Sequence, residues 1–249
     1  MNKPNFLVIG AARSGTTLLH SYLLQHPEIY VPKNKQPEPH FFLKSHLYQK
    51  GEDWYHEKFF SEVTSEKAIG EISTSYLFGE KVPERIKNYN PHMRFLVMLR
   101  EPKQRAFSNY WHSFKNGFEH IPFEDAIKQE ELRSENLSEE LKEIAPYSYV
   151  GRSAYFGQLN RFLNHFHRAQ FMPMLFEDFI SKPLEVLQEI CWFLKVDESF
   201  AFSPITEKEN ASNPGQEIDG STKTYLDEVF EPLNRELAEL FDLNLEKWK

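Results

Sequence analysis

The sequence predicts an α/β fold, in which a single domain spanning residues 1–249 is built on a central, mostly parallel β-sheet flanked by helices. Short apolar runs alternate along the chain with segments of helical periodicity, which is typical of β-α-β units. The apolar runs lack polar alternation, as expected for strands buried on both faces. With 249 residues, 40% of them hydrophobic, the chain can bury one sizeable core.

Two apolar runs are the clearest strands, Phe6–Ile9 and the unbroken run Phe95–Leu99. Ala68–Ile72 is a further candidate strand. Phe171–Phe176 is another apolar run, although Pro173 is expected to interrupt a strand there. The expected sheet therefore contains strands from both halves of the chain.

Helical segments follow these runs, with apolar residues recurring at intervals of three and four. The expected helices lie at Leu18–Gln25, Val82–Tyr89, Pro102–Phe114, Leu159–Phe166, Leu184–Leu194 and Leu226–Leu240. The charged segment Glu130–Glu143 is expected to form an exposed helix pair or a flap. Ser203–Thr224, which contains two prolines and two glycines, is expected to be a long loop.

Charge balance and cysteine content limit the function classes. The chain has 29 Lys and Arg against 37 Asp and Glu, a net charge of −8, so nucleic-acid binding through overall surface charge is not expected. Cys191 is the only cysteine, which excludes an intramolecular disulfide and favours a reducing, cytoplasmic location. No segment has the ~18 apolar residues of a transmembrane span. The spacing of the 10 histidines predicts no metal site.

A loop with the composition of an anion-binding loop joins the first strand to the first helix. It reads, in order, Gly10, Ala11, Ala12, Arg13, Ser14, Gly15, Thr16 and Thr17. Small residues let the backbone wrap around an anion, and the N–H groups and positive dipole end of the helix attract it. The alternative is an ordinary strand-to-helix turn, but the cation Arg13 and the hydroxyls favour anion binding.

The spacing of the loop glycines resembles that of a nucleotide P-loop, but Thr16 stands where the Walker lysine would be. Without that lysine, magnesium-dependent NTP hydrolysis is not expected, even though Met172–Asp178 has the apolar-then-acidic pattern of a Walker B strand. A phosphate monoester or a phosphosulfate suits the loop better. A P-loop kinase or NTPase and a non-catalytic nucleotide-binding protein are kept as alternatives.

Further motifs occur in a fixed order along the chain. They are Leu18-Leu19-His20 and His26-Pro27 after the loop, Glu38–Phe42, Lys81–Arg85, Arg94–Ser108, Glu177-Asp178, Pro232–Leu240 and Trp248. Together with the loop they resemble the sulfotransferases that use 3′-phosphoadenosine 5′-phosphosulfate (PAPS), in particular the heparan sulfate and other carbohydrate sulfotransferases. The resemblance covers essentially the whole chain and implies a P-loop-type sulfotransferase domain. It implies sulfuryl transfer to a hydroxyl, with an amine less favoured, of a glycan or small-molecule acceptor, and release of adenosine 3′,5′-bisphosphate.

The resemblance also assigns donor-binding residues. The loop Gly10–Thr17 would hold the 5′-phosphosulfate through its backbone and hydroxyls, and Arg13 would stabilise the leaving oxygen. Arg100 and Ser108 would bind the 3′-phosphate. From the residues alone, Arg100 lies at the carboxyl end of a strand, where anions bind in open α/β sheets, or it forms a surface ion pair.

Two donor assignments are less direct. Tyr155 matches a position near the cofactor, with a core role as the alternative. The family's late basic loop corresponds here to Ala211-Ser212-Asn213, which holds no cation, so Lys208 or backbone N–H groups would replace it.

Four residues are candidates for proton transfer or acceptor contact, and two of them, Glu38 and His40, lie in a proline-rich loop. The resemblance implies that Glu38 is the general base and that His40 is its neighbour in the acceptor site; a solvated loop acid is the alternative for Glu38. Glu71 is the second candidate base. His112, one helical turn after Ser108, matches a histidine of the N-sulfotransferase branch, with a surface histidine as the alternative.

Ile72 departs from the family pattern. Related enzymes have a lysine at this position, so a cationic contact to the acceptor is missing. A small-molecule, lipid-linked or lightly charged glycan hydroxyl is therefore expected in preference to a highly sulfated chain.

Overall fold

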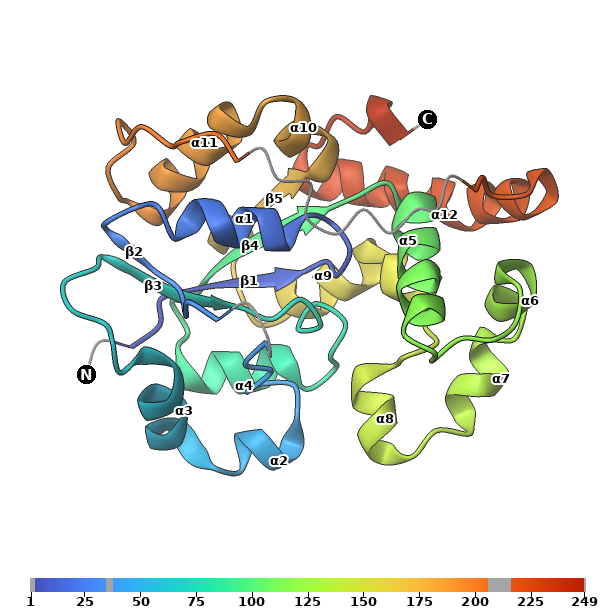
Figure 1. Ribbon diagram of the computed structural model, residues 1–249, viewed down its shortest axis with the longest axis horizontal. Coiled ribbons are helices and arrows are strands. Elements are labelled where there is room, and N and C mark those ends of the chain that lie inside the picture. Colours follow the sequence, from blue (N-terminus) through green and yellow to red (C-terminus); the bar gives the residue numbers. More distant parts are fainter. Residues whose placement is uncertain (1–2, 35–37, 206–215, 249) are drawn as a thin grey trace. The chain divides into compact units, whose positions relative to one another are not determined.

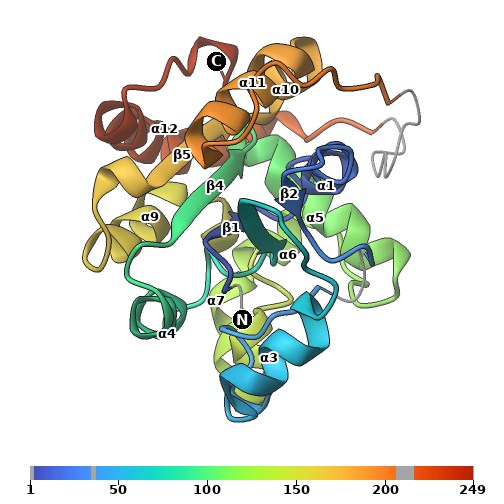
Figure 2. The same cartoon turned by 90° about the vertical axis from the view of Figure 1, so that its left-hand side faces the viewer.

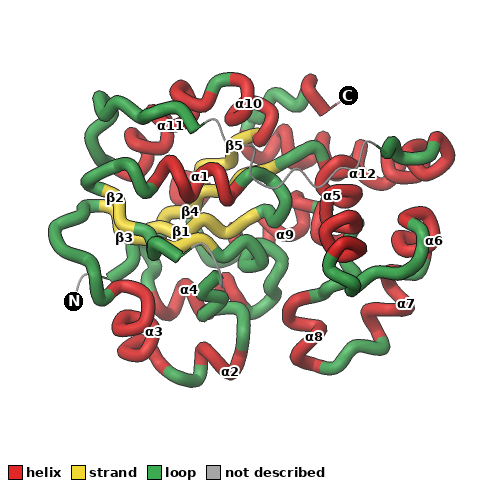
Figure 3. Tube along the Cα trace, viewed as in Figure 1, coloured by secondary structure: helices red, strands yellow, loops and turns green. Residues whose placement is uncertain are grey.

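Five parallel strands form the central sheet of the computed structural model, which describes residues 3–34, 38–205 and 216–248 (Figures 1 and 3). The strand order is β2-β3-β1-β4-β5. The strands are β1 (Phe6–Gly10), β2 (Ile29–Tyr30), β3 (Ala68–Ile72), β4 (Arg94–Leu99) and β5 (Phe171–Leu175). Every pair in the described sheet is parallel, which confirms the α/β class.

The middle strands are apolar because both of their faces are covered. All residues of β1 are buried, as are the last five residues of β4. β5 lies at the edge, where Pro173 pairs with Val97 without breaking the strand. The expectation that Pro173 would interrupt this strand is therefore wrong, because an edge strand tolerates a residue that lacks an N–H donor.

The described residues group into two compact units. The first contains residues 3–34, 38–99 and 162–205, and the second contains residues 100–161 and 216–248. The whole sheet belongs to the first unit.

In the first unit, helices cover both faces of the sheet (Figures 1 and 2). They are α1 (Thr16–Leu23), α2 (Ser45–Tyr48), α3 (Gly51–Phe60), α4 (Val82–Tyr89), α10 (Phe176–Ser181) and α11 (Pro183–Leu194). The main core lies between the strands and α1, α10 and α11 and includes Val8, Leu23, Met98, Phe179 and Leu187, all fully buried. On the opposite face, Phe95 packs between the rings of Phe162, Phe166 and Phe171.

The second unit is helical. Its α-helices are α5 (Pro102–Lys115), α6 (Phe123–Lys128), α7 (Glu130–Glu135), α8 (Glu139–Ile144), α9 (Tyr155–Leu163) and α12 (Gly220–Phe241). The last two residues of α9 belong to the first unit. Two short 3₁₀ helices, Gly151–Ser153 and Glu246–Trp248, complete the unit. Phe107, Phe123, Leu226 and Phe230 form its apolar core. Arg105 is fully buried, with Nε donating to Ser153 Oγ at 2.6 Å and NH2 donating to the Tyr149 carbonyl at 2.7 Å.

The sequence located the longer elements well. The strand Ala68–Ile72 and the helix Val82–Tyr89 have the expected bounds, and Glu130–Glu143 forms the expected helix pair. The loop expected up to Thr224 ends earlier, because α12 begins at Gly220, where the Asp219 carboxylate accepts from Ser221 N and caps the helix.

Candidate active site

The loop after β1 has a backbone that favours close approach of an anion. Gly15 is the N-cap of α1 with φ of 82°, and Arg13 also has a positive φ, of 70°. A Cβ on Gly15 would lie 2.7 and 2.8 Å from ring carbons of Phe176, so only glycine fits there. Among the described side chains, none caps α1, which leaves its first N–H groups to a ligand.

Ser14 carries the most direct sign of a ligand at this loop. Its side chain is fully buried, and its Oγ has no hydrogen-bond partner among the described residues. A buried, unsatisfied hydroxyl is costly unless something binds it. Together with the half-buried Arg13, this hydroxyl fits the loop to a phosphate or phosphosulfate group.

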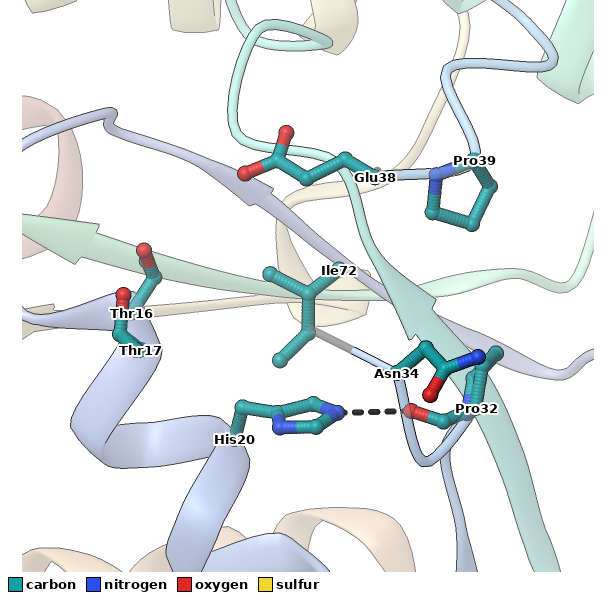
Figure 4. A pocket seen from close by; sticks show the side chains of 8 residues that line it. All are labelled: Thr16, Thr17, His20, Pro32, Asn34, Glu38, Pro39 and Ile72. Carbon is teal, nitrogen blue, oxygen red and sulfur yellow. Dashed lines mark hydrogen bonds between the residues drawn. The ribbon is translucent and has the colours of Figure 1, made fainter. Parts of the chain in front are cut away.

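A pocket of about 380 Å³, counted with the open solvent at its mouth, begins at the start of α1 (Figure 4). It is lined by Thr16, Thr17, His20, Pro32, Asn34, Glu38, Pro39 and Ile72. The His20 ring fixes one wall, because its Nε2 donates to the Pro32 carbonyl at 2.8 Å. The pocket therefore brings the hydroxyls of the anion-binding loop and the carboxylate of Glu38 into one space.

Glu38 is held by the turn that follows β3. Its Oε2 accepts from Thr74 N at 2.8 Å, and its two oxygens lie 2.9 and 3.0 Å from Thr74 Oγ1. His40 Nε2 lies 3.5 Å from Glu38 Oε2. The Glu38 side chain is 14% exposed, so a carboxylate fixed at several points still reaches the pocket.

Glu71 has a different environment. Its side chain is fully buried, and its oxygens accept three hydrogen bonds of 2.7 Å, from Tyr55 Oη, Tyr76 Oη and Ser73 Oγ. Burial raises the pKa of Glu71 from 4.5 to about 7, against the opposing effect of these three donors and with a small further rise from the charge of Glu38. Glu71 does not line the pocket, whereas the next residue, Ile72, does.

In the second unit, Arg100 directly follows β4 and precedes α5. Its carbonyl accepts from Tyr155 Oη at 2.9 Å, and Tyr155 is 1% exposed. The Glu101 carboxylate caps α5 by accepting from Lys103 N and Gln104 N. Tyr155 therefore contacts the backbone of Arg100 and is itself part of the core.

The other expected residues of this unit lie on α5. Ser108 is buried, whereas His112 is exposed and its carbonyl accepts from Asn116 Nδ2 at 2.7 Å. Lys208 and Ala211–Asn213 lie outside the described residues.

The described residues contain neither a metal-binding cluster nor a helix able to span a membrane. No group of three or more His, Cys, Asp or Glu side chains in residues 3–34, 38–205 and 216–248 is arranged to hold a metal ion. None of the helices in this part of the chain has both the length and the apolar character needed to cross a bilayer.

Comparison with known proteins identifies the family. Residues 3–212 match the sulfotransferase domain family. This chain is a sulfotransferase family member. It is 30% identical over 260 residues to the heparan sulfate glucosamine 3-O-sulfotransferase 5 of mouse and of human, an alignment that covers 95% of this chain and 72% of those proteins.

Solved structures agree with this assignment. A sulfotransferase from Alicyclobacillus acidocaldarius superimposes with a TM-score of 0.84 at 31% identity, covering 100% of this chain and 99% of that one. Mouse sulfotransferase SULT7A1, solved in complex with PAP, shares the fold, with a TM-score of 0.57 at 13% identity over 94% of this chain and 85% of that one. The chain is thus an enzyme of the PAPS-dependent sulfotransferase family, and the kinase alternative is not retained.

Sequence reasoning missed several residues of the site. Thr74, the partner of Glu38, lies two residues after the end of β3, and the rule that sites form at the carboxyl ends of parallel strands was sufficient to find it. Tyr55, a partner of Glu71, carried no sequence signal, because its proximity depends on how α3 packs. Tyr76, the other tyrosine partner, lies five residues after Glu71 in the segment that follows β3.

Proposed function

We propose that this sulfotransferase transfers the sulfuryl group of PAPS to a hydroxyl of a carbohydrate or small molecule, with Glu38 as general base and without a metal ion. The observation that carries this proposal is the pocket in which Glu38 and the hydroxyls of Thr16 and Thr17 face a common space. A base and an anion-binding loop at one pocket are what in-line transfer of a sulfuryl group requires.

The reaction has a simple balance. The acceptor oxygen bonds to sulfur while the bond from sulfur to the bridging 5′-phosphate oxygen breaks. Glu38 takes the acceptor proton, and Arg13 stabilises the charge on the leaving oxygen. The products are a sulfate ester and adenosine 3′,5′-bisphosphate.

We assign the donor's 5′-phosphosulfate to the loop Gly10–Thr17, with the unpaired Ser14 hydroxyl and the N–H groups at the start of α1 as ligands. Arg100 and Ser108 are proposed ligands of the 3′-phosphate, and Tyr155 would fix the backbone of Arg100. Lys208 stays a prediction for the same phosphate. His112 stays a predicted acceptor contact.

Glu38 is preferred to Glu71 and His40 as the base for a geometric reason. Glu71 is fully buried with both oxygens accepting hydrogen bonds, so an acceptor hydroxyl does not reach it. His40 lies next to Glu38 rather than on the pocket wall, where it would support the carboxylate as it takes up a proton.

The acceptor is proposed to be neutral or lightly charged. Glu38 is the one acidic or basic side chain among the described residues that line the pocket, apart from His20, whose Nε2 is bound to Pro32. Ile72 stands where related enzymes have a lysine. The Glu38 carboxylate at the pocket is expected to repel an anionic acceptor. The buried free cysteine, Cys191, is compatible with the proposed reducing, cytoplasmic setting.

The first experiment separates binding from chemistry. Adenosine 3′,5′-bisphosphate is expected to bind and raise the melting temperature without magnesium. Glu38→Gln, which keeps an oxygen for Thr74, is expected to bind the bisphosphate normally but to lose transfer from labelled PAPS by about 10²-fold or more. Glu62→Gln, at an exposed site of the same unit, is the matched control. Full activity of Glu38→Gln would exclude Glu38 as the base.

The second experiment tests the acceptor class. Matched unsulfated and sulfated disaccharides are compared by kcat/KM, together with a panel of neutral alcohols and phenols. The wild type is expected to prefer the uncharged acceptors, and Ile72→Lys should shift the preference toward the sulfated one. A preference of the wild type for the sulfated acceptor would refute a neutral acceptor.

A further inference from the structure

Hydrogen bonds to three residues fix the turn that carries Glu38. The Glu38 carboxylate is bound to Thr74, as described above. The backbone N–H of His40 donates to Ser73 Oγ at 2.9 Å, and that of Phe42 donates to Tyr76 Oη at 3.1 Å. All three partners belong to the residues that follow β3.

The two hydroxyls that receive these N–H groups both donate to Glu71. Ser73 Oγ donates to Oε2 and Tyr76 Oη donates to Oε1, each at 2.7 Å. A hydroxyl has one hydrogen and two lone pairs, and an ionised carboxylate can only accept. Ionised Glu71 therefore fixes the direction in which each hydroxyl donates, so that the lone pairs of each hydroxyl face the N–H groups of the turn.

Tyr55 supplies an internal comparison. Its hydroxyl, on α3, also donates to Glu71 Oε1 at 2.7 Å, but it accepts no hydrogen bond from the described N–H groups of the turn. Tyr55 and Tyr76 thus make equal bonds to the same oxygen, and only Tyr76 links it to the turn that carries Glu38.

The turn needs such support because its backbone is strained. His40 has φ of 50°, in the left-handed region, which costs roughly 1 kcal/mol for a residue with a side chain. Its carbonyl also accepts from Leu43 N and Lys44 N. The conformation persists because contacts on both sides of His40 hold it.

We propose that Glu71 is a positioning residue: through Ser73 and Tyr76 it fixes the Glu38–Phe42 turn and thereby the orientation of the Glu38 carboxylate in the pocket. The consequence for catalysis rests on the proposed function of Glu38. The geometry of β3 explains why Glu71 lies on the face of the strand opposite the pocket. Neighbouring residues of a strand point to opposite faces, so Ile72 reaches the pocket and Glu71 points into the core.

Amide hydrogen exchange tests the positioning without any turnover. Ser73→Ala is expected to accelerate exchange of the His40 amide by about fivefold to tenfold, and Tyr76→Phe that of the Phe42 amide by a similar factor. Tyr55→Phe, the matched control, should change both amides by less than about twofold. Equal acceleration in all three variants, or none in the first two, would overturn the proposal.

Kinetics test the consequence for catalysis. Ser73→Ala and Tyr76→Phe are expected to lower kcat about tenfold while the Kd for adenosine 3′,5′-bisphosphate stays within about twofold of the wild type. Tyr55→Phe should keep kcat within about twofold. If Glu71 and its partners had only a structural role, kcat would fall equally in all three variants, and that result would refute the positioning role. If the wild type transfers no sulfuryl group from PAPS to any acceptor, the proposed function fails, and the exchange measurements still decide whether the hydroxyls that link Glu71 to the turn, Ser73 and Tyr76, hold it.

Discussion

Replacing Glu71 by glutamine is expected to change how the stability of this protein depends on pH. Burial raises the pKa of Glu71 to about 7 in the folded state, against 4.5 for an unperturbed glutamate. The ionisable groups around it are Tyr55 on α3, Tyr89 on α4, Tyr76, and Glu38, whose charge also favours the protonated form.

The direction in which the free energy of unfolding changes with pH follows from proton binding. The folded state binds the Glu71 proton more tightly than the unfolded chain does, so the stabilisation is complete below pH 4.5 and is lost as the pH rises through about 7. Between about pH 8.5 and pH 6, the wild type should gain about 1.4 kcal/mol in free energy of unfolding relative to Glu71→Gln, given 1.36 kcal/mol per pKa unit. This range lies above the sequence pI of about 5.7, where the protein keeps a net negative charge.

Urea unfolding of both proteins, measured at intervals over this range, provides the assay. The difference between the two curves isolates Glu71, because other groups with lowered pKa, such as Glu28 and Asp219, contribute equally to both. A difference in free energy of unfolding that is the same at every pH reports only the cost of the substitution. Parallel curves with no convergence as the pH rises would show that Glu71 does not titrate near 7 and would refute the burial argument.

Three further predictions concern the loop and the second unit. Gly15→Ala should weaken bisphosphate binding at least about tenfold by calorimetry, because its Cβ meets Phe176 at 2.7 Å, and Gly15→Ala with Phe176→Leu should recover part of that loss. Ser14→Ala should leave the melting temperature of the ligand-free protein unchanged or slightly higher, because its hydroxyl is unpaired, yet raise the bisphosphate Kd about tenfold; unchanged affinity would remove Ser14 from the donor site. Arg105→Lys should cost about 2 kcal/mol in urea unfolding, since an ammonium cannot reach both Ser153 and the Tyr149 carbonyl, and a cost near zero would contradict its structural role.

Much of the backbone of the proposed donor-binding region could be predicted from the sequence, because its signals are local. Strand β1, the small residues that follow it and helix α1 are consecutive, so the loop Gly10–Thr17 and its anion-binding geometry are specified by neighbours in the chain. The same holds for Arg100, which directly follows an unmistakable buried strand. A nearly continuous apolar run predicts a parallel strand wherever it occurs.

The division of roles between the two acids depended on tertiary structure. Glu38 and Glu71 are 33 positions apart and carry the same functional group, so their spacing says nothing about which reaches an acceptor. The register of β3 points Ile72 to the pocket and Glu71 to the opposite face, and the packing of α3 brings Tyr55 onto it. Burial and the three hydroxyl donors then set the pKa of Glu71.

The sequence by itself thus determined the fold class and the family resemblance and suggested the residues proposed to bind the donor, because the signals for each lie in contiguous segments. Only the tertiary structure decided that Glu38 lines the pocket, that Thr74 holds it and that Glu71 lies buried behind the turn. The physical reason is that exposure, hydrogen bonding and pKa belong to an environment assembled from distant segments, which no single stretch of sequence contains.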